Sequence, residues 1–110
     1  MATTPKRLAL VNITASTLTP LYTAASGINT SASVLEFTNN ADTTIQIDIY
    51  QNDGTSDFLK RRLTLPAGVG KVRYYDGFQR QVLNAGDAIK IQALTASDFN
   101  VGLFGREVEI

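Results

Sequence analysis

The chain has 110 residues and no net charge, because ten lysines and arginines balance ten aspartates and glutamates. This length suits one domain, and the 44% of apolar residues is close to the share in ordinary globular proteins. The balanced charge argues against direct binding of nucleic acid, since such binding relies on a basic excess that neutralises phosphates. The absence of cysteine and histidine excludes disulfides and zinc–thiolate sites, and it removes the commonest general base.

The beginning of the chain, Met1-Ala2-Thr3-Thr4-Pro5, predicts a flexible arm, which we place over residues 1–7. The segment from Arg7 to Ile13 then predicts a strand with apolar residues on both faces. We expect such a strand to be covered on both sides, with a neighbouring subunit as one candidate cover. Its apolar run is too short for a signal peptide or a membrane span, so neither export nor membrane association is expected.

Strict alternation of apolar and polar residues marks three further strands. The clearest is Thr44–Gln51, where Ile45, Ile47 and Ile49 share one face. The segments Ser33–Thr38 and Ala88–Ala93 show the same period. Weaker patterns predict strands at Phe58–Leu65, where Leu59, Leu63 and Leu65 surround a basic insert, at Gly70–Tyr75 and at Phe99–Leu103.

Turn residues separate these segments at intervals of roughly eight to twelve residues. The predicted turns are Asn39–Asp42, Asp53-Gly54, Pro66–Gly68, Asp76-Gly77 and Ala85–Asp87. No segment has the pattern of a helix of even three turns. The sequence therefore predicts an all-β protein, with residues 8–110 forming a single antiparallel β-sandwich of about eight strands, either jelly-roll-like or immunoglobulin-like.

Two sets of acidic residues are candidate sites for chemistry. Glu36 and Asp48 lie on the polar faces of two strong strands, and a facing carboxylate pair is one route to glycoside hydrolysis. The loop Asp53–Asp57 places two carboxylates close together, but calcium needs six to eight oxygen ligands, and a turn whose aspartates bond to their own backbone explains the loop better. We therefore predict no enzyme activity, no catalytic residue, no metal site and no cofactor.

Two clusters are candidates for contacts with partners. Lys60-Arg61-Arg62 is the densest group of charges, and it suits either docking onto an acidic protein surface or protection of a sheet edge. Tyr74, Tyr75 and Phe78 place three aromatic rings at one hairpin. Such rings suit a protein interface, a platform that stacks on carbohydrate, or simply one core aromatic beside an ordinary surface tyrosine.

The order of several motifs resembles small structural proteins of tailed bacteriophages. The resemblance covers about residues 14–110 and implies no catalytic residue. The motifs that carry it are Leu18–Ala24, Leu35–Asn39, Ile45–Tyr50, Leu65–Gly68, the L-x-x-G-D-x-I segment at Leu83–Ile89, and Val101–Val108 with its G-x-E step at Gly105–Glu107.

The resemblance implies a β-sandwich that assembles in symmetric copies as a head-decoration, head–tail or tail-associated part of a virion. Such a protein is made in the host cytoplasm, and its partners are copies of itself and other virion proteins. The alternative is a small carbohydrate-binding or host-attachment module. The candidate interface residues are Tyr22, Lys60, Arg61, Arg62, Tyr74, Tyr75, Phe78 and Arg106.

Overall fold

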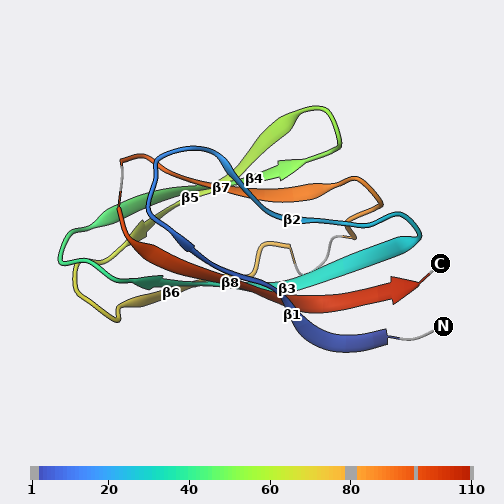
Figure 1. Ribbon diagram of the computed structural model, residues 1–110, viewed down its shortest axis with the longest axis horizontal. Helices are drawn as coiled ribbons and strands as arrows, with labels where there is room; N and C mark the ends of the chain where they lie inside the picture. Colours follow the sequence, from blue (N-terminus) through green and yellow to red (C-terminus); the bar gives the residue numbers. More distant parts are fainter. Residues whose placement is uncertain (1–2, 79–81, 96, 110) are drawn as a thin grey trace.

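A computed structural model describes residues 3–78, 82–95 and 97–109 of the chain, and these residues form eight strands (Figure 1). The strands are β1 (Thr3–Ile13), β2 (Thr19–Thr23), β3 (Ile28–Asn39), β4 (Ile45–Asn52), β5 (Asp57–Leu65), β6 (Val72–Tyr75), β7 (Ala88–Ala93) and β8 (Phe99–Glu109). They make two four-stranded antiparallel sheets that pack as a β-sandwich. The predicted fold class is confirmed.

The order of the strands gives the connectivity of a jelly roll. Sheet A has the order β1-β8-β3-β6 and sheet B the order β2-β7-β4-β5. Each successive strand crosses to the opposite sheet, except that β4 and β5 are joined as a hairpin within sheet B. Of the two sandwich types that the sequence left open, this order matches the jelly roll, which is built from two Greek keys.

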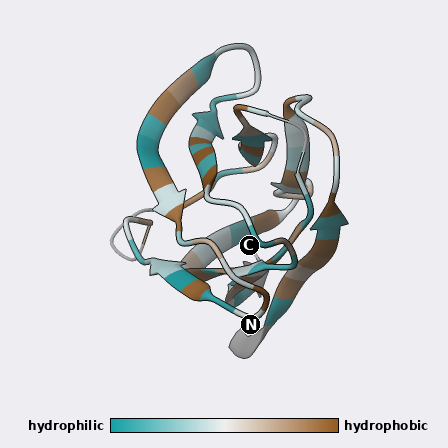
Figure 2. Ribbon diagram, turned by 90° about the vertical axis from the view of Figure 1, so that its left-hand side faces the viewer, coloured by the Kyte–Doolittle hydropathy of each residue, from teal (hydrophilic) through white to brown (hydrophobic). Residues whose placement is uncertain are grey.

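Alternation along the strands separates a buried face from an outer face in each sheet. Figure 2 shows this as alternating brown and teal bands along the ribbons. In β4, for example, Ile45, Ile47 and Ile49 are fully buried between the sheets. The five predicted turns lie between strands, apart from Asn39, which is the last residue of β3. Gly54, Gly68 and Gly86 adopt the positive φ that tight turns require.

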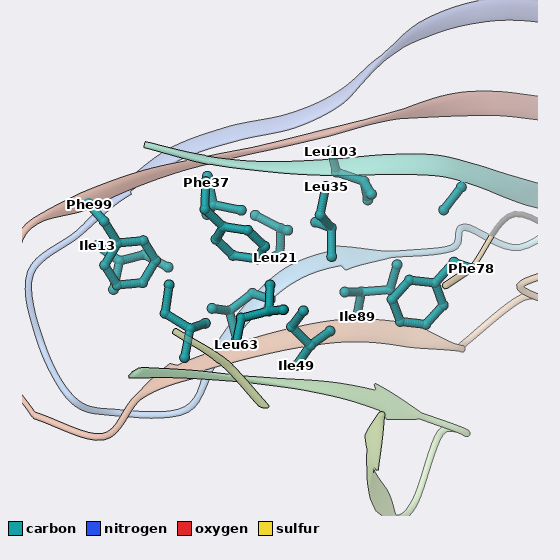
Figure 3. Close-up of a cluster of buried hydrophobic side chains, with 14 of the residues drawn as sticks. Ile13, Leu21, Leu35, Phe37, Ile49, Leu63, Phe78, Ile89, Phe99 and Leu103 are labelled. Atoms are coloured by element: carbon teal, nitrogen blue, oxygen red, sulfur yellow. The ribbon is translucent and has the colours of Figure 1, made fainter. Parts of the chain in front are cut away.

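The core lies between the two sheets. Leu35, Phe37 and Leu103 of sheet A face Ile49, Leu63 and Ile89 of sheet B (Figure 3). Phe99 packs against Phe37 with ring centroids 6.3 Å apart. This apolar layer accounts for the stability of a chain without cross-links, since burial removes about 25 cal/mol of unfavourable hydration for each Å².

Shifts of register change which residues reach the core. The shift in the β4–β5 pairing leaves Lys60 as an extra residue, so Leu63 and Leu65 point inward whereas Leu59 lies opposite Tyr50 and is exposed. A similar shift at Leu8 lets this residue join Ala9 and Val11 against the core. Leu59 therefore does not share the inner face of Leu63 and Leu65.

The first strand is longer than expected. Residues 3–7, which the sequence assigns to a flexible arm, pair with β8 from Thr3 opposite Val108 to Arg7 opposite Phe104. Small polar residues and a proline predict an arm, but an edge strand tolerates Pro5 because its missing N–H can face away from the ladder. The strand predicted from Gly70 begins only at Val72. The N–H of Gly70 donates to the carbonyl of Asn39 at the end of β3, and the N–H of Lys71 donates to the carbonyl of Gly68 within the preceding turn.

Candidate functional site

The eight candidate interface residues do not form one surface. Phe78 is buried in the core, and Tyr22 and Tyr75 pack against it. Lys60, Arg61 and Arg62 lie on β5, at the edge of sheet B. Tyr74 and Arg106 are exposed on sheet A.

The aromatic hairpin is divided between the core and the surface. Tyr75 lies opposite Leu35 and packs edge-on against Phe78, with ring centroids 5.7 Å apart. Tyr74 lies opposite Glu36 on the outer face, where 61% of it is exposed. The three rings therefore form no common platform on which a sugar ring could stack.

The three residues of the basic cluster each make different contacts. The guanidinium of Arg62 donates two hydrogen bonds to Asp48, from Nε at 2.7 Å and from Nη2 at 3.1 Å. These contacts raise the pKa of Arg62, and they compensate the carboxylate of Asp48, which is only 3% exposed. Lys60 places its ammonium 5.8 Å from the centroid of the Phe78 ring, a cation–π contact. Arg61 is exposed and is the member of the cluster most available to a partner.

Tyr22 joins the two sheets. From β2 of sheet B its hydroxyl donates to Glu107 of β8 and contacts the hydroxyl of Thr30 on β3 at 2.7 Å. Burial, followed by the hydrogen bond to Glu107, raises the pKa of Tyr22 to about 12. The hydrogen bond between Tyr22 and Glu107 therefore links the two sheets.

The carboxylates weighed for chemistry do not converge. Glu36 lies on the outer face of sheet A and Asp48 on that of sheet B, so they cannot act on the same bond. Asp53 accepts hydrogen bonds from the backbone N–H groups of Ser56 and Thr55, which lower its pKa, as expected for a turn that bonds to itself. Among the described residues, no group of three or more acidic side chains could hold a metal ion.

One surface of sheet A combines exposed apolar groups from three strands. The register aligns Leu10 with Gly102, Gly102 with Glu36, and Glu36 with Tyr74 in a row across the sheet. Leu10 is 57% exposed, and the partly buried ring of Phe104 leans over Gly102 beside it. We call Leu10, Gly102, Phe104 and Tyr74 the sheet A patch, in which Glu36 separates Tyr74 from Gly102. The apolar character of both faces of Arg7–Ile13 indicated one part of it, but only the pairing of strands brings Phe104 and Tyr74 to the same face.

A second exposed apolar group was not predicted. Phe58 and Leu59 are both exposed near the tip of the β4–β5 hairpin, which extends away from the body of the sandwich (Figure 1). Alternation alone predicts an inward Leu59, because Leu59 follows the period of the buried Leu63 and Leu65, and only the extra residue at Lys60 reverses this period.

The described residues thus form a sandwich with two small apolar surfaces and an edge that carries basic residues. No helix in the described part of the chain is long and apolar enough to cross a membrane. No protein-family model matches the chain, and no curated protein matches it in sequence.

Proposed function

We propose that this chain is a non-enzymatic structural protein of a tailed-bacteriophage virion, which assembles in symmetric copies on the capsid, the head–tail connector or the tail. The observation that carries the proposal is the jelly-roll order of its eight strands. Jelly rolls recur in viral capsid domains, as well as in lectins and cupins. A fold alone does not determine function, so the proposal also draws on the order of the phage-like motifs and on the surface.

The surface supports an assembly role over a catalytic one. The sheet A patch and the hairpin residues Phe58 and Leu59 expose apolar side chains on two different parts of one small chain. Apolar and aromatic groups on an otherwise polar surface are typical of contacts between proteins. Repeated copies convert weak contacts of this kind into a stable assembly through avidity.

The carbohydrate-binding alternative loses its main support. It relied on Tyr74, Tyr75 and Phe78 forming one platform, whereas Phe78 is buried and Tyr75 packs against the core beneath it. A single exposed tyrosine remains, which is a weak basis for stacking on a sugar.

The test is to ask whether the chain is part of a particle. Particles released from lysed cultures of the source would be purified by density gradient, treated with protease-free nuclease and analysed by mass spectrometry. The proposal expects peptides of this chain in a constant ratio to the major capsid or tail protein, and gold-labelled antibodies at one place on the particle. Complete particles that lack the chain, with all of it left in the soluble fraction, contradict the proposal.

A further inference from the structure

A sandwich of two open sheets has four edge strands, and three of them are protected against pairing with another chain. In sheet A, β6 has only four residues, and Arg73 ties it to β5 by donating to the carbonyl of Thr64 at 3.0 Å. In sheet B, β2 has five residues, a proline at position 20 and a register shift. The other edge, β5, carries three consecutive basic residues, the first of which, Lys60, is the extra residue at the register shift. These are the devices by which natural proteins keep edges from pairing.

The fourth edge, β1, carries Pro5, Lys6, Arg7 and a register shift in its first part, but none of these devices from Ala9 to Ile13. After the register shift between Arg7 and Ala9, the segment Ala9–Ile13 continues in unbroken register with β8. This segment contains no charge and no proline. Within the described residues it forms a ladder with β8 alone, so its other side presents free backbone donors and acceptors.

The same segment also exposes an apolar side chain on the face of the sheet. Leu10 is 57% exposed, and it approaches Phe104 above Gly102, where a Cβ atom would lie 3.5 Å from Cδ1 of Leu10. The free edge and the sheet A patch therefore form one continuous surface. A strand added beside β1 would pair its backbone and cover Leu10 at the same time.

We propose that the β1 edge pairs with the β1 edge of a second copy of this chain, in antiparallel orientation about a two-fold axis. An edge is always complementary to itself in this orientation, because each residue meets its own equivalent across the axis. The two copies of sheet A then form one continuous eight-stranded sheet. If the two-fold axis passes between the two Leu10 residues, their side chains lie directly opposite each other. If it passes between the two Val11 residues, the two Leu10 side chains are diagonal neighbours.

Charge favours a second copy at β1 and disfavours one at β5. Self-pairing of Ala9–Ile13 brings no charged residues together, because the segment has none. Self-pairing of β5 would instead bring Lys60, Arg61 and Arg62 close to their own equivalents, and like charges opposite each other destabilise a sheet. The inference deepens the proposed assembly function, on which its biological role rests, by naming the partner and the edge.

The first test compares the association of three proteins by light scattering after size exclusion, across a range of concentrations. Wild type is expected to form dimers or larger even-numbered assemblies. Leu10→Lys places a charge at the two-fold contact and is expected to raise the concentration needed for association at least tenfold. Val69→Lys is the matched control, because Val69 is 70% exposed on the loop before β6 and receives the same substitution. A monomeric wild type at millimolar concentration, or a Leu10→Lys protein that associates like wild type, overturns the inference.

A second test does not depend on disrupting the contact. The chain contains no cysteine, so Leu10→Cys and Val69→Cys each carry a single thiol. A short bis-maleimide is expected to link two Leu10→Cys chains efficiently and two Val69→Cys chains poorly, and equal yields contradict the pairing. If the chain is incorporated into particles but two Leu10→Cys chains are not linked, the proposed function is retained and the β1 contact is rejected.

Discussion

Gly105 lies where β8 passes between β1 and β3, and it allows these strands to approach closely. A Cβ atom at this position would lie 2.2 Å from the carbonyl oxygen of Ser31 and 2.9 Å from Cα of Ala32. Both are backbone atoms, so neither can move without displacing β3. The glycine of the G-x-E step is therefore required by packing.

We predict that Gly105→Ala lowers the free energy of unfolding by about 3 kcal/mol or more, because it overpacks a central strand. Gly102→Ala, three residues earlier on the same strand, is the control. Its Cβ would meet the side chain of Phe104 at 3.1 Å, and this ring can move aside. A change within about 1 kcal/mol is expected there. Urea denaturation of both variants measures the difference, and equal losses contradict the explanation.

Tyr22 supplies a pH dependence in the alkaline range. Its pKa is raised to about 12 in the folded protein, against about 10 in an unfolded chain. Below pH 10 the phenol is neutral in both states. Between pH 10 and 12 the unfolded chain loses this proton more readily, so the free energy of unfolding falls as pH rises.

We predict that Tyr22→Phe costs about 1–2 kcal/mol at neutral pH, because the fully buried Thr30 loses its partner. The variant should also lose part of the fall in stability between pH 10 and 12 that wild type shows. Denaturation curves at pH 8, 10 and 11.5 measure both effects. If the free energy of unfolding of the variant falls with rising pH as steeply as that of wild type, other groups cause this fall.

Among the elements, β5 shows how neighbouring charges differ in role. Arg62 is paired with the buried Asp48 on β4, whereas Arg61, the next residue along the chain, is exposed. A simultaneous reversal of both charges would therefore confuse folding with docking. Single variants separate the two roles.

We predict that Arg62→Glu clearly lowers the midpoint of urea denaturation, since it places a second negative charge beside Asp48. Arg61→Glu should leave this midpoint unchanged and should weaken assembly if Arg61 docks on an acidic partner. Circular dichroism and light scattering on the same samples measure folding and assembly. Normal assembly of Arg61→Glu assigns Arg61 to the protection of the edge.

The positions of the strands could be predicted from the sequence, but which residues of each strand face the core could not always be predicted. Alternation located β4 and β7 because their isoleucines are buried with period two, which depends only on local residues. The extra residue at Lys60 reverses that period through pairing with β4, so the exposure of Leu59 depends on a neighbouring strand. Residues 3–7, predicted as an arm, are part of a strand because they pair with β8, and this pairing also depends on a neighbouring strand.

The candidate surface was predictable to a smaller extent. Two apolar faces on Arg7–Ile13 predict cover on both sides, and Leu10 is exposed in the single chain. Cover by a neighbouring subunit stays a prediction. Leu10 and Phe104 both lie beside Gly102, and this placement of residues far apart in the sequence needs the register of β1 against β8. Tyr75 and Phe78 were assigned to an interface because aromatic residues suit both cores and contacts, and only their packing decides between the two.

On the scale of the whole molecule, β8 is the strand on which sheet A depends. It lies between β1 and β3 and pairs with both over most of its length. Its inner residues Phe99, Val101 and Leu103 are fully buried in the core. Without β8, β1 would have no partner in sheet A and could not join β3 and β6.

We predict that a chain ending at residue 98 does not fold. It should lack a cooperative thermal transition and bind a hydrophobic dye such as ANS, because β1 and β3 lose their shared partner. Addition of a synthetic peptide with residues 97–110 should restore part of the transition by filling the gap. A cooperative transition in the truncated chain without the peptide contradicts this role of β8.

The central position of β8 also affects how the protein is made. A ribosome adds about 5–20 residues per second, and β8 is synthesised after every other strand of the sandwich. For several seconds β1 and β3 exist without the strand that joins them, and their apolar residues are open to other nascent chains on the same messenger RNA. Fast translation of the final segment, or a chaperone that holds the unfinished sheet, would shorten or shield this interval, so synonymous codon changes near residues 90–110 should alter the soluble yield without altering the protein.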